Sequence, residues 1–196
     1  MFKKLLKRNK EEFGSNFIYG DFIEDLSLCD DIIKFHEMNP NKGNGVTVPP
    51  SDSSIKKSTD SRLSDNQELL MRYDRELSKV LEKYKEKYKF CNEYGAWRIT
   101  SPINIQHYKP GEGFFVWHTE RARVEEPMVS RHLVFMTYLN DVTDGGETEW
   151  YYQKLKIKPR KGYTVIWTSD WTHTHRGLTS PTQEKYIVTG WFNYVK

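Results

Sequence analysis

Apolar and polar residues alternate along this chain with two different periods, and the change falls near residue 95. Before that point, apolar residues recur every three or four positions, which is the spacing of one face of an α-helix. After it, they alternate with polar residues at every second position, as expected for strands that are buried on one face. The pattern therefore predicts a helical first part, 15–95, and a β-rich second part, 96–196.

Two helices are predicted in the first part. The earlier one follows Asp21–Ile23 and ends before Asn39-Pro40, and its apolar positions are Leu26, Leu28, Ile32, Ile33 and Phe35. The later one runs from about residue 65 to about residue 89 and begins with the capping-box pair Ser64 and Gln67. Its apolar stripe consists of Leu70, Tyr73, Leu77, Val80, Leu81, Tyr84 and Tyr88. Its other face is rich in Lys and Glu and is expected to face solvent.

Residues 39–63 contain mainly Asn, Gly, Pro, Ser, Asp and Lys, with little apolar content. This composition predicts a loop of about 25 residues, and unstructured loops of that length are uncommon inside a compact domain unless they are functional. Two interpretations follow. The segment is either a lid that closes over a substrate or an insertion without a fixed conformation.

Short segments rich in β-branched and aromatic residues make up the second part: 96–108, 114–121, 130–139, 147–151, 155–158, 163–168 and 185–194. Turn sequences such as Pro110-Gly111 and Asp144-Gly145-Gly146 separate them. Because no helical stretch lies between these strands, they are expected to pair antiparallel. The predicted fold is mainly β with flanking helices: a double-stranded β-helix, or jelly roll, with two N-terminal support helices packed on the outside of one sheet. Residues 1–196 are expected to form a single domain.

The composition excludes several classes of protein. A mean hydropathy of −0.78, without an apolar run of about 20 residues, excludes a membrane-spanning protein. A net charge of +3 is too small for a nucleic-acid-binding surface. Cys29 and Cys91 lack the spacing of a zinc site, and the basic first ten residues are not followed by the apolar segment of a signal peptide. A reducing, cytoplasmic location is therefore expected.

His118 and Glu120 stand two positions apart on a predicted strand, so their side chains point to the same face of the sheet. A second imidazole about 55 residues later, from His173 or His175, would complete a set of two histidines and one carboxylate. Such a set occupies one face of an octahedral metal ion and is characteristic of non-haem Fe(II) oxygenases.

Three further residues supply what a dicarboxylate co-substrate would need. Lys185 follows His175 by ten residues on an apolar strand, and it can present its charge to a carboxylate inside a pocket. Tyr108 precedes His118 by ten residues, and Tyr138 ends a predicted strand. Both tyrosines can add hydroxyl donors to the same carboxylate.

Four motifs that contain these residues follow one another over about residues 97–194. They are Ile105-Gln-His-Tyr-Lys-Pro-Gly-Glu-Gly113 with His118-Thr-Glu120, then Tyr138-Leu-Asn-Asp-Val-Thr-Asp-Gly-Gly-Glu-Thr-Glu-Trp150, then Pro159-Arg-Lys-Gly-Tyr163, and finally His175 with Lys185 and Trp191-Phe192. Their order and spacing resemble the prolyl 4-hydroxylase branch of the Fe(II)/2-oxoglutarate-dependent dioxygenases.

This resemblance implies three groups of functional residues. The catalytic residues, which bind Fe(II), would be His118, Glu120 and His175. The residues that bind 2-oxoglutarate would be Lys185, which pairs with the distal carboxylate, and Tyr108 and Tyr138, which hydrogen-bond to it. Residues near the substrate would include Arg131 and Trp191.

Two positions depart from the family pattern. The family usually has aspartate where Glu120 stands, and the additional methylene moves the carboxylate. Threonine is frequent where Val134 stands, so one polar contact to the co-substrate is expected to be missing.

The assignments above also predict where the remaining histidines and aromatic residues lie. His175 is the expected distal ligand because of its spacing to Lys185 and the Arg176-Gly177 that follows it. His173 is then expected behind the ligands or beside the substrate. Trp117, together with Phe114 and Trp171, is expected to line the mouth of the jelly roll. The other histidines are assigned to the core or the surface: His36, His107 and His132.

The resemblance implies hydroxylation of an unactivated C–H bond, with release of succinate and CO2. Fe(II), 2-oxoglutarate and O2 would take part, with ascorbate as an optional cofactor. The expected substrate is a prolyl or other residue in a peptide or protein, and the alternative is a free amino acid or another small metabolite. A jelly-roll binding protein without activity is the competing class, and the complete set of ligands with Lys185 argues against it. Neither a nucleic acid nor a membrane is expected as a partner.

Overall fold

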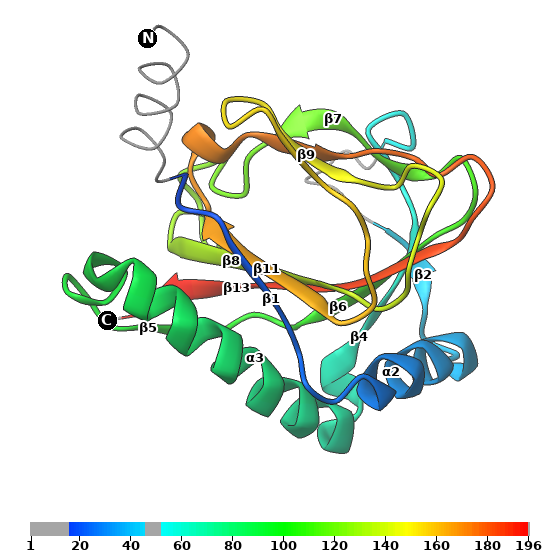
Figure 1. Cartoon of the computed structure of the whole chain (residues 1–196), viewed down its shortest axis with the longest axis horizontal. Coiled ribbons are helices and arrows are strands. Elements are labelled where there is room, and N and C mark those ends of the chain that lie inside the picture. The colour runs from blue at the N-terminus through cyan, green and yellow to red at the C-terminus, as the bar shows by residue number, and fades with distance from the viewer. Residues whose placement is uncertain (1–15, 46–51, 196) are drawn as a thin grey trace, which may run out of the picture.

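Two antiparallel sheets lie face to face, and the helices cover the outer face of the larger one (Figure 1). The computed structural model describes residues 16–45 and 52–195. In this part of the chain the larger sheet has eight strands. Seven of them lie in the order β1 (Tyr19–Phe22), β11 (Tyr163–Thr168), β8 (Arg131–Tyr138), β13 (Lys185–Tyr194), β6 (Asn104–Tyr108), β4 (Thr59–Arg62) and β2 (Gly43–Asn44). The eighth strand, β5 (Trp97–Ile99), pairs with β13 outside this order. The smaller sheet has the order β10 (Leu155–Ile157), β9 (Thr148–Trp150), β12 (His175–Gly177), β7 (Gly113–His118) and β3 (Lys56–Lys57). The predicted jelly-roll fold is confirmed.

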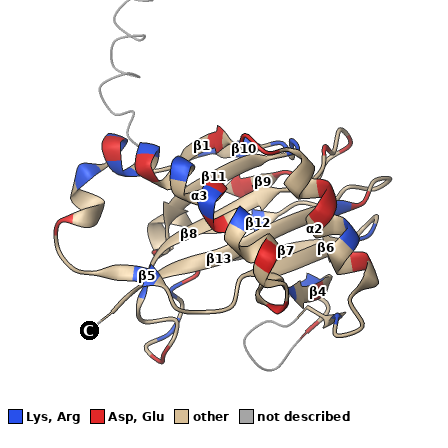
Figure 2. Cartoon of the chain, turned by 90° about the horizontal axis from the view of Figure 1, so that it is seen from below, with Lys and Arg blue, Asp and Glu red and all other residues tan. Residues whose placement is uncertain are grey.

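Both predicted helices are present as α2 (Ser27–Met38) and α3 (Gln67–Lys87), and both pack on the larger sheet. The core between them is made of residues at helical spacing, including Ile32, Tyr73 and Leu77, and of Phe135 and Val188 from the sheet. Both acidic and basic residues occur along the outer side of α3 (Figure 2). The predicted division of α3 into an apolar and a charged face is therefore correct.

The N-terminus of α3 is capped by a different residue from the one predicted. Ser64 lies in a single 3₁₀ turn, Leu63–Asp65, and Asn66 is the N-cap. The Oδ1 atom of Asn66 accepts a hydrogen bond of 3.1 Å from the backbone N–H of Leu69. The side chain of Gln67 donates to the Ser64 carbonyl at 3.0 Å instead of reaching the cap N–H. Asn66 alone therefore satisfies the first turn through a side-chain acceptor.

The expectation of an unstructured loop over 39–63 is wrong for the described residues. Strand β4 adds to β6 at the edge of the larger sheet, and β3 adds to β7 at the edge of the smaller one. Lys56 is buried, and its Nζ atom lies 2.7 Å from the Asp60 carboxylate. Polar residues can form these strands because the partner strands supply the backbone hydrogen bonds. Residues 46–51, the centre of the predicted lid, lie outside the described residues.

Two strand predictions also need correction. The predicted strand 96–108 is divided into β5 and β6, which pair with opposite ends of β13. Pro102 lies in the break, where its missing N–H would interrupt a ladder. Strands β1 and β12 were not predicted, because four and three residues are too few to show a period.

None of the helices in residues 16–45 and 52–195 is long and apolar enough to cross a membrane. Cys29 and Cys91 are both free thiols. The cytoplasmic location stays a prediction, and the basic residues 1–10 on which it partly rests lie outside the described residues.

Candidate active site

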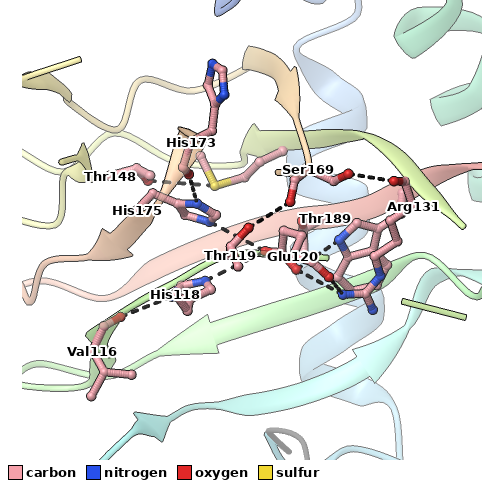
Figure 3. A network of polar contacts seen from close by, with 12 residues as sticks. Val116, His118, Thr119, Glu120, Arg131, Thr148, Ser169, His173, His175 and Thr189 are labelled. Carbon is pink, nitrogen blue, oxygen red and sulfur yellow. Dashed lines mark hydrogen bonds and ion pairs between the residues drawn. The ribbon is translucent and has the colours of Figure 1, made fainter. Parts of the chain in front are cut away.

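Three predicted side chains meet between the two sheets (Figure 3). His118 ends β7 and lies opposite His175, the first residue of β12, while Glu120 follows two positions after His118. The Oε1 atom of Glu120 lies 3.7 Å from His118 Nε2 and 3.5 Å from His175 Nε2. One ligand atom from each residue lies within 4.8 Å of the other two, which is compatible with a shared metal ion.

The backbone sets the tautomer of both histidines. His118 Nδ1 lies 3.1 Å from the Val116 carbonyl, and His175 Nδ1 lies 2.9 Å from the His173 carbonyl. A carbonyl oxygen only accepts, so each Nδ1 carries the proton and donates it. The lone pairs of both Nε2 atoms therefore point toward Glu120, as metal-binding imidazoles require. Burial, followed by the neighbouring His175, lowers the pKa of His118 and favours this neutral form.

Aromatic rings hold the two imidazoles in place. Phe114 stacks on His118 with a centroid distance of 3.6 Å. Trp167 meets the His175 ring edge to face at 5.1 Å, and Trp150 lies behind it at 6.1 Å. These contacts restrict ring rotation and shield the triad from water.

Glu120 is held by two donors on the side away from the histidines. Its Oε2 atom accepts from Trp191 Nε1 at 3.0 Å and from Arg131 Nη1 at 3.2 Å. The guanidinium of Arg131 also stacks on the Trp191 ring, 3.8 Å from its centroid. The Oε1 atom of Glu120 is therefore left free to serve a metal.

Arg131 and Trp191 lie directly behind Glu120, and their predicted position beside the substrate stays a prediction. Both are directed at the carboxylate of Glu120, and Arg131 donates a further bond of 2.7 Å to the Glu120 carbonyl. Glutamate has one more methylene than the aspartate usual in the family. The hydrogen bonds from Arg131 and Trp191 determine where the carboxylate of this longer side chain lies. The two residues are positioning residues for Glu120 in this structure.

Replacing Arg131 with methionine is expected to weaken Fe(II) binding by about 10- to 100-fold, the range found when hydrogen-bond partners of metal ligands are removed. Methionine retains an apolar stem against Trp191 but donates nothing to Glu120. Anaerobic Fe(II) titration of the folded variant measures the effect. Arg121→Met is the matched control, because the Arg121 guanidinium pairs with Asp170 instead. Unchanged Fe(II) affinity in Arg131→Met would contradict the positioning role.

Ser169 joins the segments that carry these residues, and it was not predicted. Its carbonyl accepts from Thr119 Oγ1 at 2.8 Å and from the Arg121 N–H at 3.0 Å, and its hydroxyl donates to the Arg131 carbonyl at 2.6 Å (Figure 3). These bonds fix the backbone on both sides of Glu120. A single serine after a strand carries no sequence signal for such a role.

Lys185 is almost completely buried at the start of β13. Its Nζ atom donates to the carbonyls of Gly146 at 3.0 Å and Leu178 at 3.2 Å, and it lies 4.8 Å from the centroid of the Tyr108 ring. Both hydrogen bonds go to neutral groups, so the described residues give this ammonium no carboxylate partner. Burial lowers the pKa of Lys185 to about 8. A buried cation without a counter-ion favours the binding of an anion.

The Lys185 ammonium lies against the strand that carries His175. Gly177 lies two residues after His175 on β12, and a Cβ atom there would be 3.8 Å from Lys185 Nζ and 3.7 Å from the Phe114 Cβ. Lys185 Nζ is therefore directly beside β12, two residues along the strand from His175. A small dicarboxylate co-substrate needs a metal at one end and a cation at the other, and the triad and Lys185 are the residues that would supply them.

Neither predicted tyrosine directs its hydroxyl at Lys185. The Tyr108 hydroxyl donates to Gln106 Oε1 at 2.7 Å. The Tyr138 hydroxyl lies 2.7 Å from Thr148 Oγ1 and 3.1 Å from the Ile157 carbonyl. Tyr108 contacts Lys185 through its ring, so hydrogen bonding of both tyrosines to 2-oxoglutarate stays a prediction.

The side chains of His173 and Trp117 make contacts away from the triad, and their predicted place near the substrate stays a prediction. The His173 ring is bound to Thr168 Oγ1 at 2.7 Å and to the Asn16 carbonyl at 2.8 Å, so only its backbone carbonyl serves the site. Trp117 stands next to His118 on the strand and therefore points to the opposite face. There it packs against Tyr151 and under the Arg176 guanidinium, 4.3 Å from its ring centroid. In these positions the two side chains do not line the space beside the triad.

Residues 103–193 match the family model of the 2OG-Fe(II) oxygenase superfamily, in which 2OG is 2-oxoglutarate. The match covers slightly less than half of the chain, and it includes the strands that carry the triad and Lys185. It supports a 2-oxoglutarate-dependent dioxygenase, a class of enzyme that uses Fe(II), 2-oxoglutarate and O2. The matched segment contains all of the residues predicted for the site. No curated protein matches the sequence.

Solved structures of prolyl hydroxylases have the same fold. A viral collagen prolyl hydroxylase of Paramecium bursaria Chlorella virus-1, in complex with 2-oxoglutarate, is 19% identical, with a TM-score of 0.64 over 91% of this chain and 97% of that one. A prolyl 4-hydroxylase of Pseudomonas putida is 14% identical, with a TM-score of 0.70 over 96% and 99%. A prolyl hydroxylase of Trichoplax adhaerens, in complex with a hypoxia-inducible-factor peptide, is 16% identical, with a TM-score of 0.71 over 97% and 92%. The predicted resemblance to the prolyl 4-hydroxylase branch is confirmed for the fold.

Proposed function

We propose that this oxygenase hydroxylates an unactivated C–H bond of a prolyl or other residue in a peptide, with release of succinate and CO2. In this proposal His118, Glu120 and His175 hold Fe(II), and Lys185 binds the distal carboxylate of 2-oxoglutarate. The observation that carries it is the convergence of two Nε2 lone pairs on one free carboxylate oxygen. The unpaired buried ammonium nearby supports the second assignment.

Bound Fe(II) would supply the activation of O2 and the oxidation of the C–H bond. The protein's own residues provide geometry and charge. Glu120 contributes a negative charge that Arg131 and Trp191 keep in place. The backbone carbonyls behind His118 and His175 maintain the neutral tautomers. Lys185 orients the co-substrate by pairing with its far end, and the aromatic walls exclude water.

A peptide is the proposed substrate because the fold matches that of enzymes described as prolyl hydroxylases. Exposed aromatic side chains beyond the end of β9 provide a surface for a chain-like ligand. Tyr151, Tyr152 and Trp171 form a continuous row with ring centroids 5.2 and 5.8 Å apart. All three are more than half exposed. Such rings bind extended and proline-rich chains well.

Two measurements test the proposal. Anaerobic addition of Fe(II) and 2-oxoglutarate to the apo-protein should produce the visible charge-transfer band of the iron chelate. With O2 and a library of proline-containing peptides, mass spectrometry should then show the gain of one oxygen atom. Succinate release without peptide oxidation, but with oxidation of a free amino acid, would replace the peptide by a small substrate. A folded protein with neither band nor succinate formation would overturn the proposal.

A further inference from the structure

A second group of metal-ligating side chains lies on the helix-covered side of the larger sheet. His36 and Glu37 come from α2, and His107 comes from β6. One ligand atom of each lies within 4.8 Å of the other two. His107 precedes Tyr108, whose side chain faces the interior between the sheets, so His107 points to the opposite face. This group is therefore separate from the site of His118.

Both histidines of the group have a buried nitrogen without a partner. His36 is fully buried, and its Nδ1 atom lies 2.7 Å from the Ser61 hydroxyl, while its Nε2 atom has no hydrogen-bond partner. His107 is buried too, and its ring stacks on Tyr186 with a centroid distance of 4.1 Å. Its Nε2 atom also lacks a hydrogen bond and lies 3.4 Å from a carboxylate oxygen of Glu184. Buried polar nitrogens are normally satisfied, so this pair indicates a missing ligand.

The negative charge of the carboxylates beside the histidines is not fully balanced by neighbouring cations. The Tyr186 hydroxyl lies 3.0 Å from Glu37 Oε1 and 3.0 Å from Glu184 Oε2. A phenol has one proton and can donate to only one of these two carboxylates. Among the described residues, Lys42 is the lysine paired with Glu37, at 3.7 Å. Among the described residues Glu184 has no lysine or arginine partner, and a cation between the carboxylates and the imidazoles would balance the charge.

The nearest other charges do not change this balance. Asp60, which also lies on the His36 side, is paired with Lys56 at 2.7 Å. The side chains of Glu37 and Glu184 are about half exposed, so an ion has a path from solvent. An imidazole pair with carboxylates is a donor set that suits Zn²⁺, which prefers four nitrogen or oxygen ligands in a closed site.

We propose that His36, Glu37 and His107 form a second divalent-metal site, with Zn²⁺ as the fitting ion and Glu184 beside it. The site joins α2 to β6. It therefore fastens the support helix to the strand that carries Tyr108. Its role is structural, because the group lies on the side of the sheet away from the proposed iron centre.

Zinc titration of a variant without the iron centre tests the proposal separately from the proposed function. In His118→Ala/His175→Ala, calorimetry should show one equivalent of bound Zn²⁺. Adding Glu37→Gln or His107→Asn should weaken that binding at least tenfold. Glu82→Gln is the matched control, because Glu82 is an exposed helical glutamate that pairs with Lys85, and it should leave the affinity unchanged.

A second measurement does not depend on the folding of the double variant. The wild-type protein should bind two equivalents of Zn²⁺, and His107→Asn should bind one. Circular dichroism shows whether each variant is folded. No zinc binding by the folded double variant, an unchanged number of bound zinc ions in folded His107→Asn, or equal affinity with and without Glu37→Gln would overturn the second site.

Discussion

Glu120→Ala is expected to abolish Fe(II) binding and turnover, with a loss well above the roughly 100-fold that follows removal of a ligand's hydrogen-bond partner. The substitution removes the one carboxylate of the triad. It also leaves the Trp191 N–H without its acceptor and removes the carboxylate that neutralises the Arg131 guanidinium. Unpaired buried donors are costly, so a lower melting temperature is expected as well. Anaerobic Fe(II) titration and succinate release measure the two functional effects.

Two further variants at Glu120 separate the effect of its negative charge from the effect of its side-chain length. Glu120→Gln retains the length but loses the charge, so it should lose Fe(II) affinity almost as fully as alanine. Glu120→Asp retains the charge but withdraws the carboxylate from Arg131 and Trp191, so binding should be weakened and not lost. Glu149→Ala is the control, since Glu149 pairs with Arg176 outside the triad. Normal Fe(II) affinity in folded Glu120→Ala would refute the assignment of this ligand.

Lys185→Met is expected to have opposite effects on function and on stability. The co-substrate loses its only cationic partner among the residues assigned to the site, so the KM for 2-oxoglutarate should rise by at least about 100-fold, corresponding to about 3 kcal/mol for a charge-assisted contact. The apo-protein, in contrast, should become more stable by about 1–3 kcal/mol at pH 7. The substitution replaces a buried ammonium without a carboxylate partner by an apolar side chain of similar length.

The pH dependence of stability provides an independent check. Burial lowers the pKa of Lys185 from 10.5 to about 8. Between these two pH values the unfolded chain still holds a proton that the folded protein has released. Stability of the wild type therefore rises with pH in this window, by about 3 kcal/mol in total at about 1.4 kcal/mol per pKa unit. Below pH 8 this contribution is constant, so the advantage of Lys185→Met should be full there and should disappear toward pH 10.5.

Lys56→Met provides the matched comparison for this effect. Lys56 is as deeply buried as Lys185, but it is paired with Asp60 at 2.7 Å. Its replacement leaves the Asp60 carboxylate without its cationic partner and should destabilise the protein. Urea denaturation of both variants and the wild type between pH 7 and pH 10 gives the required free energies. If Lys185→Met were less stable than the wild type at pH 7 and bound 2-oxoglutarate normally, both parts of the prediction would be wrong.

Local patterns along the chain were sufficient for the fold class and for the choice of candidate residues. The apolar stripe that includes Tyr73 and Leu77 predicted α3 because helical period and burial are both local properties of a helix. His118 and Glu120 were selected because residues two apart on an extended strand face the same side. The structure brings these two together with His175, as the spacing suggested.

The sequence pattern could not predict the short strands that are stabilised mainly by their partner strands. The polar segments that form β3 and β4 look like a loop, and β12 has only three residues, His175–Gly177. Their stability comes from backbone hydrogen bonds to β6, β7 and β9, which any residue except proline can form. The alternation of apolar and polar residues therefore does not reveal a strand that is stabilised by backbone hydrogen bonds to its neighbours.

The roles of individual side chains were also decided by the tertiary structure. Trp191 is 71 residues away from Glu120 in sequence, yet its N–H orients the carboxylate that the sequence alone assigned to the metal. His36 and His107 carry no shared motif and meet only because α2 packs on β6. The sequence by itself determined the fold class and the candidate residues, which follow from periodicity and spacing, and its motifs carried the resemblance to a known family. Only the tertiary structure decided which side chains touch, because contacts between distant segments depend on how sheets and helices pack.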